Sequence, residues 1–143
     1  MPAELRVEVV EREDVTVMFK RVADKQSAIT AAWAELEQKV GSLRGRKFYG
    51  VFYDKALLND CAEYHVCVQV RDDYDPAKLG LEVGTVPGGR YARVRLEGEP
   101  PAVYSLIAPT FKQLGERPDR DSRRPHVEFY RRHDLIDLLL PVA

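Results

Sequence analysis

The sequence predicts an α+β fold in which two similar units, each with the order strand, helix, strand, strand, share one antiparallel sheet. The chain has 143 residues, of which 45% are hydrophobic, and this is enough for one ordinary domain with a buried core. Segments with the alternation typical of strands flank two segments with helical periodicity. The same order of segments occurs twice, at a spacing of roughly 75 residues, which indicates a duplicated unit.

The first unit, about residues 5–72, is expected to begin with strand-like segments at 5–10 and 15–22. A polar break separates them, so they form either a pair of strands or one interrupted strand. The next segment, ending near residue 40, carries Trp33 among apolar residues at helical spacing, and polar residues fill much of its opposite side. This pattern predicts an amphipathic helix that packs on a sheet.

Two further strands complete the first unit, at 47–54 and 63–70. In the second of these, Tyr64 and three valines alternate with more polar residues, which predicts a strand with one buried face. A charged, proline-containing segment at 71–78 follows and is typical of a linker.

The second unit, about residues 80–142, repeats this order. Its helix is expected at 100–114, where Pro109 predicts a kink or break near 105–108. Its strands are expected at 81–86, 90–98, 126–131 and 135–142. Each unit is too small to bury its helix and sheet alone, so we expect the two to pack about a pseudo-twofold axis, with the helices flanking a central cleft.

The charge of the chain offers no electrostatic footprint for nucleic acid. Twenty-two Lys and Arg residues balance 23 Asp and Glu residues, for a net charge of -1. The local cluster of Arg117, Arg120, Arg123 and Arg124 alternates with aspartates and is typical of a solvated loop. Nor does any segment have the pattern of a helix-turn-helix, so we expect no direct binding to nucleic acid.

The remaining composition excludes several further classes. Two cysteines, Cys61 and Cys67, make neither a disulfide framework nor a metal-ligand set, so we expect no metal and no cofactor. Neither a signal peptide nor an apolar run of membrane-spanning length is found, so we expect a cytoplasmic protein that does not bind membranes.

The strand expected at 126–131 carries a carboxylate between aromatic residues. Its alternation places His126, Glu128 and Tyr130 on one face. Local pattern alone favours a Glu128 that faces water from the outer side of a sheet. The alternative is a carboxylate buried in an aromatic pocket, where it would bind a cation.

Several short motifs, in their order, resemble those of the gyrase-inhibitor-like (GyrI-like) effector-binding domain, which also supplies the drug-sensing domains of multidrug-responsive bacterial transcription regulators. The resemblance covers almost the whole chain. Its motifs are Pro87-Gly88-Gly89-Arg90-Tyr91, Gly98-Glu99-Pro100 leading into Tyr104, Val127-Glu128-Phe129-Tyr130 and Leu140-Pro141-Val142, with Tyr49-Gly50-Val51-Phe52-Tyr53-Asp54 as the counterpart in the first half.

The resemblance implies a cleft that binds amphipathic, often cationic, aromatic molecules. It makes Glu128 the charge partner, places Tyr130 next to it on the same strand face, and gives Tyr104 the role of stacking over the ligand. Residue type and region add further candidates for the walls: Trp33, Tyr49, Tyr64 and Tyr91. Each of these four could instead be a core residue.

Two other functions stay open. Some stand-alone members of the family resemble hydrolases of electrophilic, cyclopropane-bearing genotoxic compounds, and a catalytic site here would use Glu128 with Tyr104 or Tyr130. Other members resemble inhibitors of DNA gyrase, which implies a protein-interaction module. Exposed strand edges could also pair two copies into a homodimer.

Overall fold

The computed structural model describes residues 6–23, 25–40, 47–53, 63–70, 75–132 and 134–143. They form an eight-stranded antiparallel sheet with helices on one face, so the predicted α+β class is confirmed. The elements are β1 (Glu8–Arg12), β2 (Val15–Ala23), α1 (Gln26–Val40), β3 (Phe48–Tyr53), β4 (Glu63–Gln69), β5 (Glu82–Val86), β6 (Gly89–Glu97), the 3-10 segment η1 (Ala102–Leu106), α3 (Ile107–Leu114), β7 (His126–Arg132) and β8 (Leu135–Pro141).

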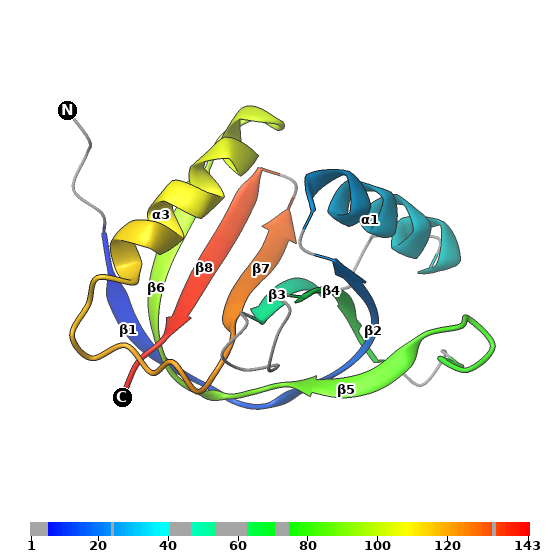
Figure 1. Cartoon of the computed structure of the whole chain (residues 1–143), viewed down its shortest axis with the longest axis horizontal. Helices are drawn as coiled ribbons and strands as arrows, with labels where there is room; N and C mark the ends of the chain where they lie inside the picture. Colours follow the sequence, from blue (N-terminus) through cyan, green and yellow to red (C-terminus); the bar gives the residue numbers. More distant parts are fainter. Residues whose placement is uncertain (1–5, 24, 41–46, 54–62, 71–74, 133) are drawn as a thin grey trace.

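The strand order across the sheet is β1-β6-β8-β7-β3-β4-β2-β5. If β1, β2, β3 and β4 are matched with β5, β6, β7 and β8, the order from one edge corresponds to the order from the other edge. In Figure 1, α1 and α3 lie on the same side of the sheet, with β7 and β8 visible between them. This symmetric order supports the predicted internal repeat, which stays a prediction.

The strand-like segments at the start of each unit form one long ribbon. β1 and β2 do not pair with each other, so the first of the two alternatives was wrong. Instead β1 pairs with β6, and β2 pairs with β5. The strand register is the same on both sides of the break, since Arg12 lies opposite Gly89 and Val15 lies opposite Val86. Each unit therefore begins with one interrupted strand.

The break in this ribbon is a close crossing of two turns. The backbone N–H of Gly88 donates to the Asp14 carboxylate at 2.6 Å. A Cβ on Gly88 would lie 2.5 Å from the carbonyl oxygen of Arg12, so a larger residue would force the two turns apart. The ribbon bends at this point, and in Figure 1 it curves below the central strands of the sheet.

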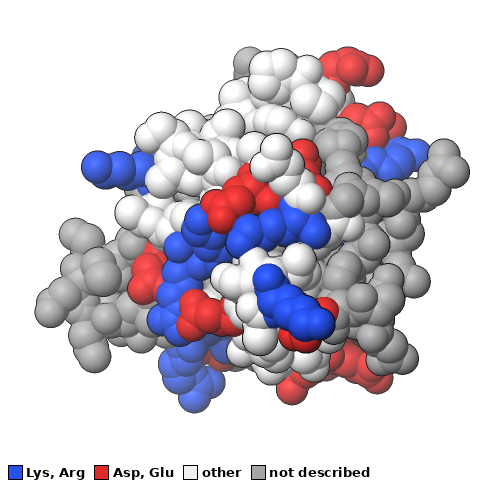
Figure 2. All heavy atoms as spheres, turned by 90° about the vertical axis from the view of Figure 1, so that its right-hand side faces the viewer, with Lys and Arg blue, Asp and Glu red and all other residues white. Residues whose placement is uncertain are grey.

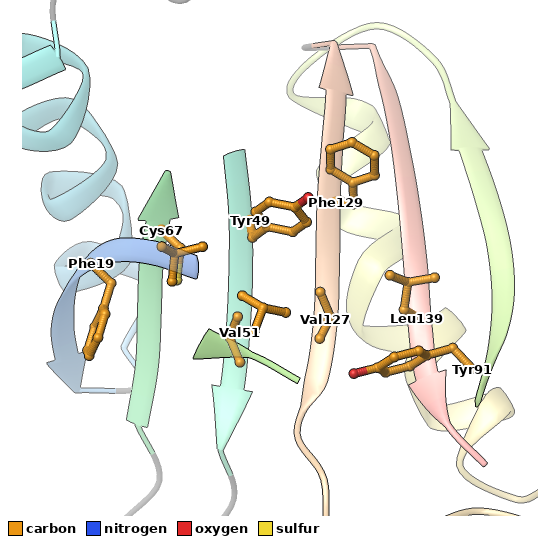
Figure 3. Close-up of a cluster of buried hydrophobic side chains, with 10 residues drawn as sticks. Phe19, Tyr49, Val51, Cys67, Tyr91, Val127, Phe129 and Leu139 are labelled. Atoms are coloured by element: carbon orange, nitrogen blue, oxygen red, sulfur yellow. The ribbon is translucent and has the colours of Figure 1, made fainter. Parts of the chain in front are cut away.

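Because the ribbon covers the face opposite the helices, the central strands are buried on both sides. One cluster fills that covered face and includes Phe19, Tyr49, Cys67, Tyr91 and Phe129 (Figure 3). The predicted buried face of β4 is confirmed by Tyr64, Val66 and Val68, and the ribbon also covers part of the opposite face, where Cys67 is 1% exposed.

The helix face has two clusters, one beneath each helix. Ala32, Leu36 and Val40 of α1 pack with β4, as the helical spacing predicted, and Phe111 and Leu114 of α3 pack with β6 and β8. Tyr130 contacts both clusters and therefore marks the seam between the two units.

The second helical segment is broken where its proline predicted. η1 ends at Leu106 and α3 begins at Ile107. Pro109 has no N–H to donate to the carbonyl of Ser105, so a continuous α-helix loses a hydrogen bond there. The change from 3-10 to α-helical geometry between Leu106 and Ile107 falls within the region 105–108 where the sequence predicted a kink or break.

Charged residues on the outer surface are largely mixed in sign. Figure 2 shows the face that carries α1, β2 and β5, where basic and acidic side chains lie side by side. Lys20 pairs with Glu35, and Arg21 pairs with Glu82 at 2.8 Å. Within the described residues, no helix is long and apolar enough to cross a membrane.

One buried acid ties the centre of the sheet to two arginines. The Asp137 side chain on β8 is 0% exposed and accepts hydrogen bonds from Arg95 at 2.7 Å and Arg131 at 2.8 Å. Burial alone would raise the pKa of Asp137, but the hydrogen bonds from the two guanidinium groups outweigh it and lower the pKa.

Asp137→Asn should therefore destabilise the fold in a pH-dependent way. Because the pKa of Asp137 is lowered in the folded state, its contribution is complete above the ordinary value of 3.8 and is lost as the pH falls through the lowered value. We expect the free energy of unfolding to fall by about 1–2 kcal/mol near neutral pH. The decrease is small because both arginines are partly exposed to solvent. Urea unfolding at neutral pH and near pH 3 measures both values. An equal loss at the two pH values would contradict this prediction.

Candidate functional site

A cleft of about 1710 Å³ lies on the helix face of the sheet, where α1, η1 and α3 contribute its walls. β3, β4 and β7 form its floor. The described lining residues include Trp33, Phe48, Tyr64, Tyr104, Phe111, Glu128 and Tyr130. The lining is mostly apolar and aromatic, as in pockets that bind organic molecules.

Glu128 lies at the floor of the cleft. It occupies the middle of β7, and the alternation of the strand directs its side chain to the helix face, while Val127 and Phe129 point into the opposite core. Only 8% of Glu128 is exposed, so the expectation from local pattern that it faces water was wrong. The cause is tertiary, because both helices flank the strand and enclose that face.

Two tyrosine hydroxyls donate to the same oxygen of Glu128. Tyr64 Oη lies 2.8 Å from Oε1, and Tyr130 Oη lies 2.5 Å from it. Burial and then the negative charge of Glu128 raise the pKa of both tyrosines well above 10.0. Both hydroxyls therefore keep their protons at neutral pH and act as donors.

Gly50 makes room for this arrangement. It lies opposite Glu128 on the neighbouring strand β3. A Cβ at this position would lie 1.9 Å from Tyr64 Oη and 2.8 Å from Glu128 Oε1. Tyr64 reaches Glu128 from β4 only because the intervening strand carries no side chain at this point.

Aromatic rings surround the carboxylate. The ring of Trp33 on α1 meets Tyr130 edge to face, with centroids 5.2 Å apart, and lies 6.5 Å from Tyr64. Tyr104 lines the cleft from η1 and is 39% exposed, so it lies at the mouth. The site thus has a fixed floor and a more accessible aromatic rim.

The structure brings five of the seven predicted site residues to this cleft: Trp33, Tyr64, Tyr104, Glu128 and Tyr130. It places Tyr49 and Tyr91 in the core of the opposite face, each 1% exposed (Figure 3). Tyr49 stacks on Phe129 at 4.9 Å, and the hydroxyl of Tyr91 donates to the carbonyl of Pro87. These two tyrosines lie on the face of the sheet opposite the cleft, and we do not retain them as site residues.

Several residues of the site were not expected from the sequence, among them Phe48, Gly50 and Phe111. Phe48 and Gly50 are two positions apart on β3, so strand alternation places them on the same face. The alternation of β3 was visible in the sequence. The role of Gly50 becomes clear only from its pairing with Glu128 on the neighbouring strand.

The described residues offer little for other chemistry. They contain no group of three His, Cys, Asp or Glu side chains that could hold a metal ion. The Cys67 thiol lies on the opposite face, and burial raises its pKa, so it is a poor nucleophile there. A carboxylate with two hydroxyl donors inside an aromatic cleft is suited to hold an organic cation or to position a water molecule.

Gly50→Ala should disturb this site. The new methyl group collides with the Tyr64 hydroxyl, so we expect unfolding free energy to fall by about 1–3 kcal/mol. Thermal and urea unfolding measure the loss. In a Tyr64→Leu background, which removes the obstructing end of the ring, the same substitution should cost less. An equal cost in both backgrounds would show that Gly50 has no particular relation to Tyr64.

Comparison with solved structures shows the same fold in proteins of low sequence identity. The Vibrio cholerae integron cassette protein VCH_CASS2 has a TM-score of 0.74 at 16% identity, covering 96% of this chain and 95% of the other. SAV2435 bound to tetraphenylphosphonium has a TM-score of 0.72 at 15% identity, covering 97% and 94%. A putative transcription regulation protein of Staphylococcus aureus has a TM-score of 0.69 at 14% identity, covering 97% and 99%.

These neighbours show the fold alone, and together with the family match that follows they confirm the predicted GyrI-like effector-binding domain. No curated protein matches the chain. A family described as integron-associated effector binding protein, Cass2, matches residues 8–142. Since this match spans nearly the whole chain, the protein belongs to the Cass2 family of integron-associated effector-binding proteins.

Proposed function

We propose that the protein binds amphipathic, cationic, aromatic small molecules in the cleft between its two helices. Glu128 is the counter-charge in this proposal, and Trp33, Tyr64, Tyr104 and Tyr130 are the aromatic walls. The observation that carries it is the Glu128 carboxylate, 8% exposed, with the hydroxyls of Tyr64 and Tyr130 on one oxygen.

The electrostatic part of the proposal follows from burial. Removing a carboxylate from water costs several kcal/mol, and the two hydroxyl hydrogen bonds offset part of that cost. A positive charge about 4 Å away, at an effective dielectric constant near 20, contributes a Coulomb attraction of about 4 kcal/mol before its own desolvation. Delocalised organic cations lose less hydration energy than a compact ammonium group, so the site favours them.

The aromatic part of the proposal accounts for shape and breadth. Each ring that presents its face to a cation contributes about 0.5–2 kcal/mol. Aromatic surfaces also bury the apolar body of the ligand without requiring one hydrogen-bonding pattern. The cleft therefore favours large, flat or propeller-shaped cations as a class.

The comparisons support a ligand of this kind. The family is one of effector-binding proteins. The structure of the neighbour SAV2435 contains tetraphenylphosphonium, an organic cation that carries four phenyl groups on its phosphorus atom. We take this molecule as a model for the ligand of the present protein.

A fluorescence titration with rhodamine 6G tests the proposal. We expect the native protein to bind the dye with micromolar affinity or better, and Glu128→Gln to weaken binding by a factor of ten or more, about 1.4 kcal/mol. Glutamine keeps the shape of the side chain and removes its charge.

Glu37→Gln is the matched control, because Glu37 also lines the cleft but is exposed to solvent. We expect its effect to stay below about threefold, because solvent screens an exposed charge. If the two variants lose affinity equally, the burial of Glu128 has no special role. Consumption of a cyclopropane-bearing compound by the native protein, absent in Glu128→Gln, would instead support the hydrolase alternative.

Trp33 provides an independent readout, since it is the only tryptophan of the chain. A ligand that enters the cleft lies against its ring, so we expect tetraphenylphosphonium to change the intrinsic fluorescence of the protein in a saturable way. Trp33→Phe should remove the signal while binding, measured by calorimetry, weakens by about threefold to tenfold. An unchanged emission at saturation would place the ligand outside the cleft.

A further inference from the structure

The walls around Glu128 are not uniformly acidic. The described lining residues include the basic side chains Lys47, Lys112 and Arg120 as well as the acidic Glu37 and Glu116. A site built only to attract cations would gain from an acidic rim, because basic side chains repel a cationic ligand as it approaches. The presence of basic groups in the same cleft calls for a separate explanation.

Arg120 differs from the other three arginines of its loop in its position. Of these four described arginines, Arg120 lines the cleft, and Arg117, Arg123 and Arg124 do not. The prediction of a solvated loop agrees with Arg120 and Arg123, which are both exposed, whereas Arg117 and Arg124 are partly buried. Arg120 therefore lines the cleft at its solvent-accessible rim.

The position of Arg120 is fixed by its surroundings. Its backbone forms a bridge with Val142 at the end of β8, which holds the loop against the sheet. Its Nη2 lies 3.5 Å from Nε2 of His126. The His126 ring stacks on Phe111, with ring centroids 4.9 Å apart. It is tilted relative to the ring of Phe52, with ring centroids 5.9 Å apart. The guanidinium therefore lies at an aromatic end of the cleft.

This end of the cleft is close to Glu128. His126 and Glu128 are two positions apart on the same face of β7, and this spacing corresponds to about 7 Å along a strand. A single organic molecule of moderate size can therefore contact both the carboxylate and the guanidinium group. The planar donor fork of arginine suits a carboxylate or another oxyanion.

We propose that Arg120, supported by His126, forms an anion subsite next to Glu128, and that the cleft takes zwitterionic aromatic ligands in which an anionic group accompanies the cation. This inference rests on the proposed function and specifies its ligand class. The cationic ring system lies over Glu128 between the aromatic walls, and the anionic group lies against Arg120.

Two dyes with the same cationic ring system test this inference. Rhodamine 6G carries an ethyl ester on its pendant phenyl ring, and rhodamine 19 carries the free carboxylate at the same place. We expect the native protein to bind rhodamine 19 at least about threefold more tightly than rhodamine 6G, because only the acid can pair with Arg120. Fluorescence anisotropy measures both affinities.

Arg120→Gln should abolish this preference. We expect it to weaken binding of rhodamine 19 by about threefold, which is the preference it removes, and to change binding of rhodamine 6G by less than about twofold. The effect stays modest because Arg120 is exposed, and it is measurable because the carboxylate of the dye pairs with the guanidinium group directly. Retained binding of rhodamine 6G also shows that the variant is folded. Arg123→Gln, in the same loop but outside the cleft, is the matched control and should change neither affinity. Arg120→Lys should restore part of the preference.

The outcomes separate this inference from the proposed function. Binding of rhodamine 6G that depends on Glu128, together with weaker binding of rhodamine 19 or an equal effect of Arg120→Gln on both dyes, would overturn the anion subsite alone. Failure of both dyes to bind the native protein would overturn the proposed function and the subsite with it.

Discussion

The burial of one carboxylate is the constraint on which the site depends. Glu128 is held away from water between the two clusters of the helix face, so each of its neighbours has to compensate for lost hydration or provide space. Tyr64 and Tyr130 supply hydroxyl donors, and Gly50 leaves the gap through which Tyr64 reaches the carboxylate. The helices then enclose this group with aromatic rings, and the proposed binding of an organic cation depends on the same packing.

The sheet can support such a site because its other face is fully packed. The bent ribbon made of β1, β2, β5 and β6 covers that face and buries Tyr49, Tyr91 and Cys67. The core on this side stabilises the strands independently of the helices. The helix face can therefore keep an open cleft where another small α+β domain would need to fill the space with side chains.

Much of the fold was predictable because its signals are local. Alternation identified the strands, helical spacing identified α1, and Pro109 located the break before α3. The burial of Glu128, and the assignment of Tyr64 to the site but Tyr49 to the core, depend on which strands are neighbours. Strand neighbours are set by contacts far apart in the sequence, such as Gly50 opposite Glu128, and no local pattern specifies them. For Glu128, Tyr104 and Tyr130, a family resemblance supplied what periodicity could not.

The central claim is that the charge of Glu128 interacts with the charge of the ligand. Calorimetric titration of the native protein and Glu128→Gln with tetraphenylphosphonium and with neutral triphenylphosphine oxide forms a thermodynamic cycle that isolates this interaction. We predict a coupling free energy of about 1.4 kcal/mol or more, with the loss of affinity confined to the cation. A coupling near zero, with both ligands affected equally by the substitution, would show that Glu128 shapes the cleft without acting as a counter-charge.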